Sequence, residues 1–408
     1  MKPSSELFDL IKSLSKSEKR FFKLSSSLQS GEKNYLKIFD VIEKQKEYNE
    51  EGLKETFAHE KFINHLPSEK NHLYKLILKS LRGFHSDNSV SSVLKEEIKN
   101  VEILYKKALF KECGKFLRRA KNIAEQHEKF YYWFELLSWE KMLIEEDFEE
   151  GDFSHDLDQL ITEERIVIEK LRNMAEYQII YSRINYIFRS GGFVTKVEDV
   201  ASVDEIANHH LILGKNTAIS SSAAAMCYYI QGLCNATKRD YATAVVKFSR
   251  AKQILDDNPK IKQDQPQSYV RTTHNLIQSQ ISQGNFDLAQ ELVNEMDQLI
   301  THKGFKSYDV RVKIFSSVYT SQIAISYKRG AFQATLKIVD EMIEGLKEHQ
   351  EKLPKEQLVL FSYHIAYVFF GAGLYRDALK WVNKILNDNE QNLRQDIYGY
   401  TRLFNLIV

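Results

Sequence analysis

The chain has 408 residues, of which 43% are hydrophobic and 28% charged, with only 16 glycines and 5 prolines. The hydrophobic fraction excludes a disordered chain, and the shortage of the residues that make tight turns argues against an all-β protein. Lysine plus arginine (57) and aspartate plus glutamate (56) nearly cancel, giving a net charge of +1. The charge of the whole chain therefore argues neither for nor against a nucleic-acid partner, and any basic surface must be local.

Residues 1–90 are predicted to form an N-terminal helical cap or small bundle. Ser15 and Glu18 have the spacing of a capping box, in which each side chain accepts a hydrogen bond from the other residue's amide. The helix that follows is basic, and in a DNA-binding regulator such cations would contact phosphates. They are Lys16, Lys19, Arg20 and Lys23, and a second strip could form from Lys75, Lys79 and Arg82. Acidic residues dilute both strips and no helix-turn-helix pattern is present, so an ordinary solvated helix face is the favoured interpretation.

Residues 91–190 carry the apolar period of long amphipathic helices and are predicted to form hairpins that are degenerate repeats. The sequence Ser190-Gly191-Gly192 interrupts the helical pattern and marks the next division. Residues 191–408 are predicted to form a repeat array.

The array is indicated by four segments that share one pattern. A glycine or arginine is followed two positions later by an aromatic residue, then by a small residue three positions on and a large apolar residue four further. The aromatic residues are Tyr241, Phe286, Phe332 and Tyr375, separated by 45, 46 and 43 residues. The small residues are Ala244, Ala289, Thr335 and Ala378, and the apolar ones Phe248, Val293, Val339 and Val382. Because glycine adopts the positive φ that ends a helix and a small residue lets two helices approach closely, the pattern predicts stacked helical hairpins.

These units resemble the tetratricopeptide repeat family, whose hairpins pair a bulky and a small residue on the first helix with an alanine and an aromatic on the second. The matching residues are Tyr228, Gly232, Tyr241, Ala244, Phe248 and Ala251, and in the last unit Ala366, Gly373, Tyr375 and Ala378. Gln231 and Asn235 depart from the family's usual leucine and tyrosine. The repeats also exceed the usual length of about 34 residues by about ten, so we expect longer helices. The resemblance implies an all-α fold, a right-handed α-α superhelix (a TPR-like solenoid) behind the N-terminal cap.

The resemblance also implies a peptide-binding groove on the concave side, lined by the first helix of each hairpin. Its residues would be Tyr229, then Arg271, His274, Asn275, Gln278 and Ser282, then Thr320, Tyr327 and Lys328, then Tyr363, His364 and Tyr367. Those from Arg271 to Ser282 recur at helical spacing and form one polar stripe. The family's clamp for a C-terminal carboxylate uses lysine and asparagine where this chain has His274 and Gln278, so that ligand is not predicted.

The motifs of known catalytic sites do not occur in the chain. His59 and His65 are six residues apart, whereas a zinc-protease helix needs four, and no Gly-x-Ser-x-Gly sequence occurs. We therefore predict a non-enzymatic interaction protein that binds a peptide or helix of a protein partner, without cofactor or metal. The alternative is a nucleic-acid-binding regulator that uses the N-terminal basic helices, with the repeats as a sensor or dimerisation module.

The two ends of the sequence give two further expectations. The first residues lack the apolar stretch of a secretory signal, and three scattered cysteines favour neither disulfides nor zinc, so we expect a soluble, cytoplasmic protein without membrane association. Residues 398–408 form an apolar run without a polar cap. We expect that the native chain continues past Val408 or, as the less favoured alternative, that this end docks on another surface.

Overall fold

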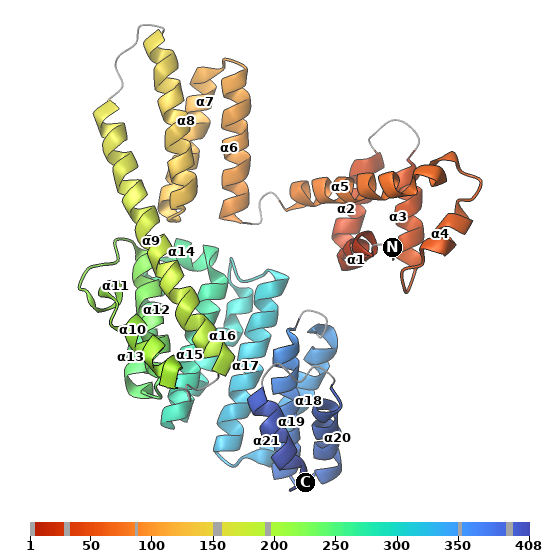
Figure 1. Cartoon of the computed structure of the whole chain (residues 1–408), viewed down its shortest axis with the longest axis vertical. Helices are drawn as coiled ribbons and strands as arrows, with labels where there is room; N and C mark the ends of the chain where they lie inside the picture. The colour runs from red at the N-terminus through yellow and green to blue at the C-terminus, as the bar shows by residue number, and fades with distance from the viewer. Residues whose placement is uncertain are drawn as a thin grey trace. The chain divides into compact units, whose positions relative to one another are not determined.

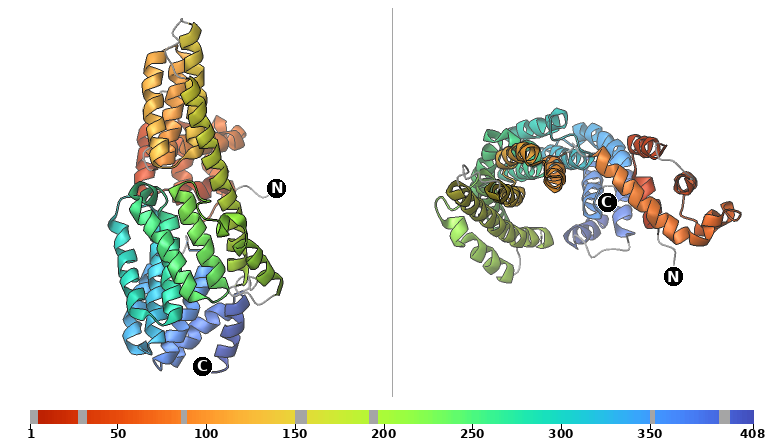
Figure 2. Two further views of the ribbon diagram at one scale, coloured as in Figure 1. Left: turned by 90° about the vertical axis from the view of Figure 1, so that its left-hand side faces the viewer. Right: turned by 90° about the horizontal axis from the view of Figure 1, so that it is seen from above.

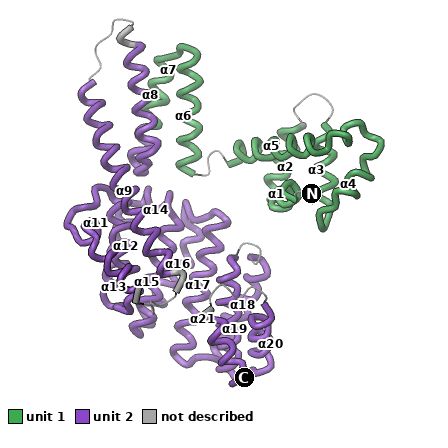
Figure 3. The backbone as a smooth tube through the Cα atoms, viewed as in Figure 1, with its two compact units in different colours: residues 1–120 green, residues 121–408 purple. Residues whose placement is uncertain are grey.

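A computed structural model of the protein describes residues 5–27, 33–85, 89–149, 157–191, 197–349, 353–388 and 395–408. Every regular element in these ranges is a helix, which confirms the predicted all-α class. No helix in the same ranges is long and apolar enough to cross a bilayer. The chain divides into two compact units, residues 1–120 and 121–408 (Figure 3).

The first unit begins with a bundle in which α5 packs against α1, α2 and α3. Its helices are α1 (Glu6–Ser13), α2 (Lys16–Ser27), α3 (Asn34–Lys44), α4 (Glu50–Thr56), the 3-10 turn η1 (Lys61–His65), α5 (Leu66–Phe84), α6 (Val90–Lys106) and most of α7 (Phe110–Gln126). Apolar side chains at helical spacing, among them Ile11, Phe39 and Ile77, are fully buried between these helices. The Ser15 amide donates to Glu18 Oε2 at 2.7 Å and the Glu18 amide to Ser15 Oγ at 3.2 Å, so the predicted capping box is confirmed.

The second unit is a succession of helices that pack on their neighbours in chain order (Figures 1 and 2). Its early helices are α8 (Phe130–Glu149), α9 (Leu157–Gly191), α10 (Val197–Ala207) and α11 (His210–Leu213). The later ones are α12 (Ser221–Thr237), α13 (Tyr241–Asp257), α14 (Pro259–Asp264), α15 (Pro266–Gln283), α16 (Phe286–Gln298), the 3-10 turn η2 (Leu299–Thr301), α17 (Tyr308–Lys328), α18 (Phe332–His349), α19 (Lys355–Gly371), α20 (Tyr375–Leu386) and α21 (Gln395–Asn405). The pairs α12–α13, α15–α16, α17–α18 and α19–α20 form hairpins, and their first helices also contact one another from α15 through α17 to α19.

The four-segment pattern of the sequence coincides with the start of the second helix of each hairpin. Its aromatic residue is the first residue of α13, α16, α18 and α20. The four small residues and the four large apolar residues that follow it have no exposed surface. The predicted role of these positions in close helix packing is therefore confirmed. The aromatic residues differ in exposure: Tyr375 keeps 54% of its surface in solvent, whereas Tyr241, Phe286 and Phe332 are half-buried.

Each hairpin turn starts with a residue in the left-handed backbone conformation. Gly284, Gly330 and Gly373 have φ of 84°, 72° and 78°, and Arg239 takes the place of glycine with φ of 63°. The next residue's amide donates to the carbonyl five residues before it, at 2.8 to 3.0 Å, which closes a Schellman motif in all four turns.

Two turns of the same kind, which the sequence pattern did not reveal, lie further towards the N-terminus. Ala108 and Glu128 have φ of 55° and 50°. The amides of the residues that follow them, Leu109 and Lys129, donate to carbonyls five residues back at 3.0 and 2.7 Å. The spacing of the aromatic, buried and apolar positions is also kept: Phe110, Cys113 and Leu117 after the first turn, and Phe130, Trp133 and Leu137 after the second.

Candidate functional site

The residues predicted to line a groove all lie on the first helices of the hairpins. Tyr229 is on α12, the stripe from Arg271 to Ser282 is on α15, and the remaining residues are on α17 and α19. Neighbouring first helices bring several of them together, as described below. They differ in exposure: Ser282 and Lys328 are exposed, whereas Tyr229, Thr320 and His364 keep only 5%, 7% and 8% of their surface in solvent.

Arg271 lies beside two neighbouring tyrosine rings, whose centres are 5.9 Å apart. Its guanidinium carbon is 4.9 Å from the ring centre of Tyr181 on α9 and 5.4 Å from that of Tyr229, and Nη1 donates to the Tyr181 hydroxyl at 2.6 Å. Such cation–π contacts stabilise a guanidinium more when it is shielded from water. The buried Nε has no hydrogen-bond partner in the described part of the chain. Tyr181 was not among the predicted site residues, because it precedes the repeats with no matching motif.

Polar side chains join each first helix to the next along this face. Asn275 Nδ2 donates to the Tyr229 hydroxyl at 2.8 Å, from α15 to α12. Gln278 Nε2 donates to Ser321 Oγ on α17 at 3.0 Å. Further on, Gln357 Nε2 of α19 donates to Thr320 Oγ1 at 3.3 Å. These amides therefore hold neighbouring hairpins in register and also present their remaining polar atoms along one face.

His274 sits in the middle of the stripe with its Nδ1 atom buried and without a hydrogen-bond partner among the described residues. Burial disfavours the charged imidazolium and lowers the pKa of His274 to about 4. The side chain is therefore neutral at physiological pH and contributes no positive charge to this face.

Aromatic rings replace the amides towards α19 and α21. Tyr327 stacks on His364, with ring centres 5.9 Å apart and planes inclined by 25°. Tyr363 and Tyr367 lie 6.4 Å apart, and Phe404 of α21 contacts both. Burial, together with the neighbouring tyrosines, raises the pKa of Tyr327 and Tyr363. This end of the face thus offers apolar rings with neutral hydroxyl groups, a combination suited to amphipathic ligands.

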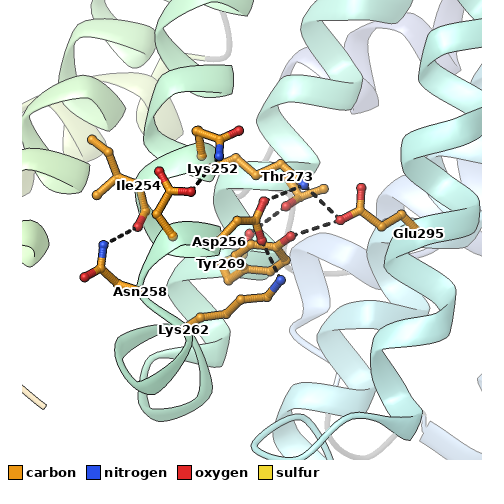
Figure 4. A network of polar contacts seen from close by, with 10 residues as sticks. Lys252, Ile254, Asp256, Asn258, Lys262, Tyr269, Thr273 and Glu295 are labelled. Atoms are coloured by element: carbon orange, nitrogen blue, oxygen red, sulfur yellow. Dashed lines mark hydrogen bonds and ion pairs between the residues drawn. The ribbon is translucent and has the colours of Figure 1, made fainter. Parts of the chain in front are cut away.

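A network of charged groups joins the hairpin that carries the stripe, α15–α16, to α13 and α14 (Figure 4). The buried Tyr269 of α15 donates its hydroxyl to Glu295 Oε1 at 3.0 Å. Lys252 of α13 pairs with Glu295 at 2.8 Å and with Asp256 at 2.9 Å, and Lys262 of α14 pairs with Asp256 at 2.5 Å. Burial and the two nearby carboxylates raise the pKa of Tyr269, so its hydroxyl stays protonated and keeps donating.

The three cysteine thiols are buried and do not form disulfides. Burial raises the pKa of Cys113 and Cys227, and that of Cys234 to about 12. Because the thiolate is the reactive form, these side chains act as small core residues at neutral pH.

The N-terminal basic helix, which carries the alternative hypothesis, is partly neutralised within its own bundle. Lys23 lies 2.9 Å from Asp40 and 2.8 Å from Glu43, and Lys19 lies 3.3 Å from Glu43. Lys16 and Arg20 are exposed. Carboxylates beside two of the four cations weaken the field that a phosphate backbone would meet.

Comparison with known proteins gives no family for this chain. No protein-family model matches the sequence. A search of curated proteins also found no match.

Proposed function

We propose that the protein is a non-enzymatic interaction protein whose second unit is a TPR-like right-handed superhelix of hairpins. A peptide or helix of a protein partner would lie across the first helices α12, α15, α17 and α19. The observation that carries the proposal is the row of amides and aromatic rings along these helices, from Arg271 beside its two tyrosines to the stack of Tyr327 on His364.

The recurring turn supports a repeat architecture. Stacked hairpins related by a constant step need the same turn geometry at each step, and the left-handed residue with its Schellman hydrogen bond recurs in that way. The chemistry of the face supports a peptide ligand. Amide side chains can bond to a backbone, tyrosines offer amphipathic contact area at low entropic cost, and Arg271 supplies a positive charge.

The test is capture of partners from a lysate of the natural source with the tagged full-length chain, with and without nuclease. The informative variants change exposed residues at the edge of the face, because Asn275 and Gln278 also join helices and their loss would disturb packing. Ser282→Arg and Lys328→Glu should each reduce capture of a specific partner at least about fivefold, while leaving the melting temperature unchanged. The matched control is Lys337→Glu on the exposed side of α18, which should capture the partner normally.

Two results would count against the proposal. Equal capture by the wild type, the Ser282→Arg and Lys328→Glu variants would exclude this face as the binding surface. Loss of every captured protein after nuclease treatment would instead point to nucleic acid as the true ligand, and attention would move to Lys16 and Arg20.

A further inference from the structure

The first unit contains a cavity that the proposed function does not use. It has a volume of about 190 Å³ and lies between the facing sides of α2 and α5. Its walls include Phe21, Phe22 and Ser25 from α2, and Leu76, Ser80 and Gly83 from α5. The cavity is partly open to solvent, and Phe21 in its wall keeps 38% of its surface exposed.

The space exists because Gly83 has no side chain at a position that faces α2. A Cβ atom built on Gly83 would find only the Phe21 ring within 4 Å, at 3.9 Å, so a larger residue would grow into the cavity without a clash at its base. The glycine lies in the last turn of a 19-residue helix, where it costs up to about 1 kcal/mol relative to alanine. No turn or positive φ requires glycine at this position.

The polar groups of the cavity are arranged asymmetrically. Lys79 is the charged residue among the described lining side chains, and it is exposed, with no carboxylate in ion-pair distance in the described ranges. Ser25 donates its hydroxyl to the Phe22 carbonyl at 3.0 Å, and its oxygen lies 3.5 Å from that of Ser80. Because the Ser25 proton goes to the Phe22 carbonyl, Ser80 is the donor in this long contact, and its hydroxyl can turn from Ser25 to a ligand. Lys79 and Ser80 are thus two donors of the lining, whose other walls include aromatic and aliphatic side chains.

We propose that this cavity binds a small monoanion with an apolar body the size of a benzene ring, of the class of aryl carboxylates. An apolar cavity of about 150 Å³ in another protein accepts benzene, so the volume suits one ring with a short polar group. The ring would lie against Phe21, Phe22 and Leu76. The carboxylate would reach the Lys79 ammonium and the Ser80 hydroxyl at the open side.

The test is titration of the full-length chain with benzoate, followed by calorimetry and by saturation-transfer NMR of the ligand. A ligand of nine heavy atoms with ordinary efficiency should bind with a Kd of about 10 mM or lower. Gly83→Leu should weaken binding at least about tenfold by filling the space, and Gly83→Ala should weaken it less. Lys79→Gln should weaken benzoate about fivefold, and neutral benzyl alcohol should bind the wild type about fivefold less tightly than benzoate.

Matched controls separate occupancy of the cavity from general effects of the substitutions. Gly114→Leu in α7, where a Cβ atom meets no heavy atom within 4 Å, and Lys75→Gln, an exposed lysine of α5 outside the cavity, should leave the Kd unchanged. Absence of benzoate binding to the wild type at about 10 mM would overturn the proposal. So would unchanged binding in a folded Gly83→Leu variant, or equal binding of benzoate and benzyl alcohol.

Discussion

Replacing Ala108 by glycine should stabilise the protein, although the change removes a side chain and adds no contact. Ala108 opens the turn between α6 and α7 with φ of 55°, the left-handed conformation in which a Cβ atom crowds the following carbonyl. Its side chain is exposed. The exchange therefore tests the backbone conformation with almost no change in packing.

The expected gain follows from two opposing effects. The left-handed conformation costs an L-residue about 1–2 kcal/mol, and glycine is free of this cost. Glycine loses more backbone entropy on folding, which costs about 0.5–1 kcal/mol. Ala108→Gly should therefore raise the free energy of unfolding by about 0.5–1 kcal/mol.

The same exchange in reverse is available in the second unit. Gly284, Gly330 and Gly373 have open space around the position of a Cβ atom, so alanine there adds backbone strain without a clash. Less the entropy that alanine saves, the net cost should again be about 0.5–1 kcal/mol each. Urea denaturation followed by circular dichroism measures these changes as shifts of the midpoint at constant m. The two compact units are best fitted as separate transitions if two appear.

The control is Ala242→Gly on the exposed side of α13, where the backbone is helical. There the same substitution should destabilise the protein by up to about 1 kcal/mol. If Ala108→Gly lowers the midpoint as Ala242→Gly does, the turn at Ala108 is not left-handed and the reasoning is refuted.

Two further predictions concern the second unit. Gly232→Ala should destabilise it by about 1–3 kcal/mol in urea titrations, because the added Cβ would lie 2.5 Å from the Phe248 ring. Phe248→Leu in the same chain should recover part of this loss. If the free-energy losses of the two single variants simply add in the double variant, this contact is contradicted. Burial lowers the pKa of His274 to about 4, so its contribution to stability is complete above its unfolded pKa of about 6.5 and is lost as the pH falls towards 4. Between about pH 7 and about pH 5 the loss of unfolding free energy from this residue amounts to no more than about 2 kcal/mol. His274→Gln should flatten that part of the pH profile of the unfolding free energy. An unchanged profile would show that His274 is not buried in its neutral form.

The helices and their register in the repeats could be read from the sequence, because both depend on local patterns. The small residues of the pattern are buried, as predicted, and the aromatic residues Tyr241, Phe286, Phe332 and Tyr375 begin the second helices. The turn at Arg239 was found although it lacks glycine, since the residues after it keep the pattern.

The turns at Ala108 and Glu128 were missed for a physical reason. In a sequence, a residue with positive φ is predicted from glycine, whereas here an alanine and a glutamate adopt this strained conformation. In the second case the carboxylate has a further partner, because Glu128 accepts hydrogen bonds from the amides of Ser221 and Ser222 at 2.9 and 2.7 Å. An aromatic residue two positions after the turn was the available signal in both cases.

The candidate face was predictable as a stripe but not as a set of contacts. Helical spacing placed Arg271, Asn275 and Gln278 together, whereas their partners Tyr181, Tyr229 and Ser321 are 43 to 90 residues away in the chain. Which long-range side chain meets which donor depends on the packing of whole helices. The cavity beside Gly83 was likewise invisible, because a glycine inside a helix gives no indication of what faces it.

The charged network around Tyr269 has a consequence for how the second unit opens. Arrays of hairpins that contact mainly their neighbours can unfold from one end, losing one hairpin at a time. Asp256 of α13, Lys262 of α14 and Glu295 of α16 are joined through shared ion pairs and the Tyr269 hydroxyl, so separating α13 from α16 leaves charges unpaired in a half-buried junction. The hairpins α12–α13 and α15–α16 should therefore exchange their amide hydrogens as one cooperative block, and fraying from the C-terminal end should halt at α16.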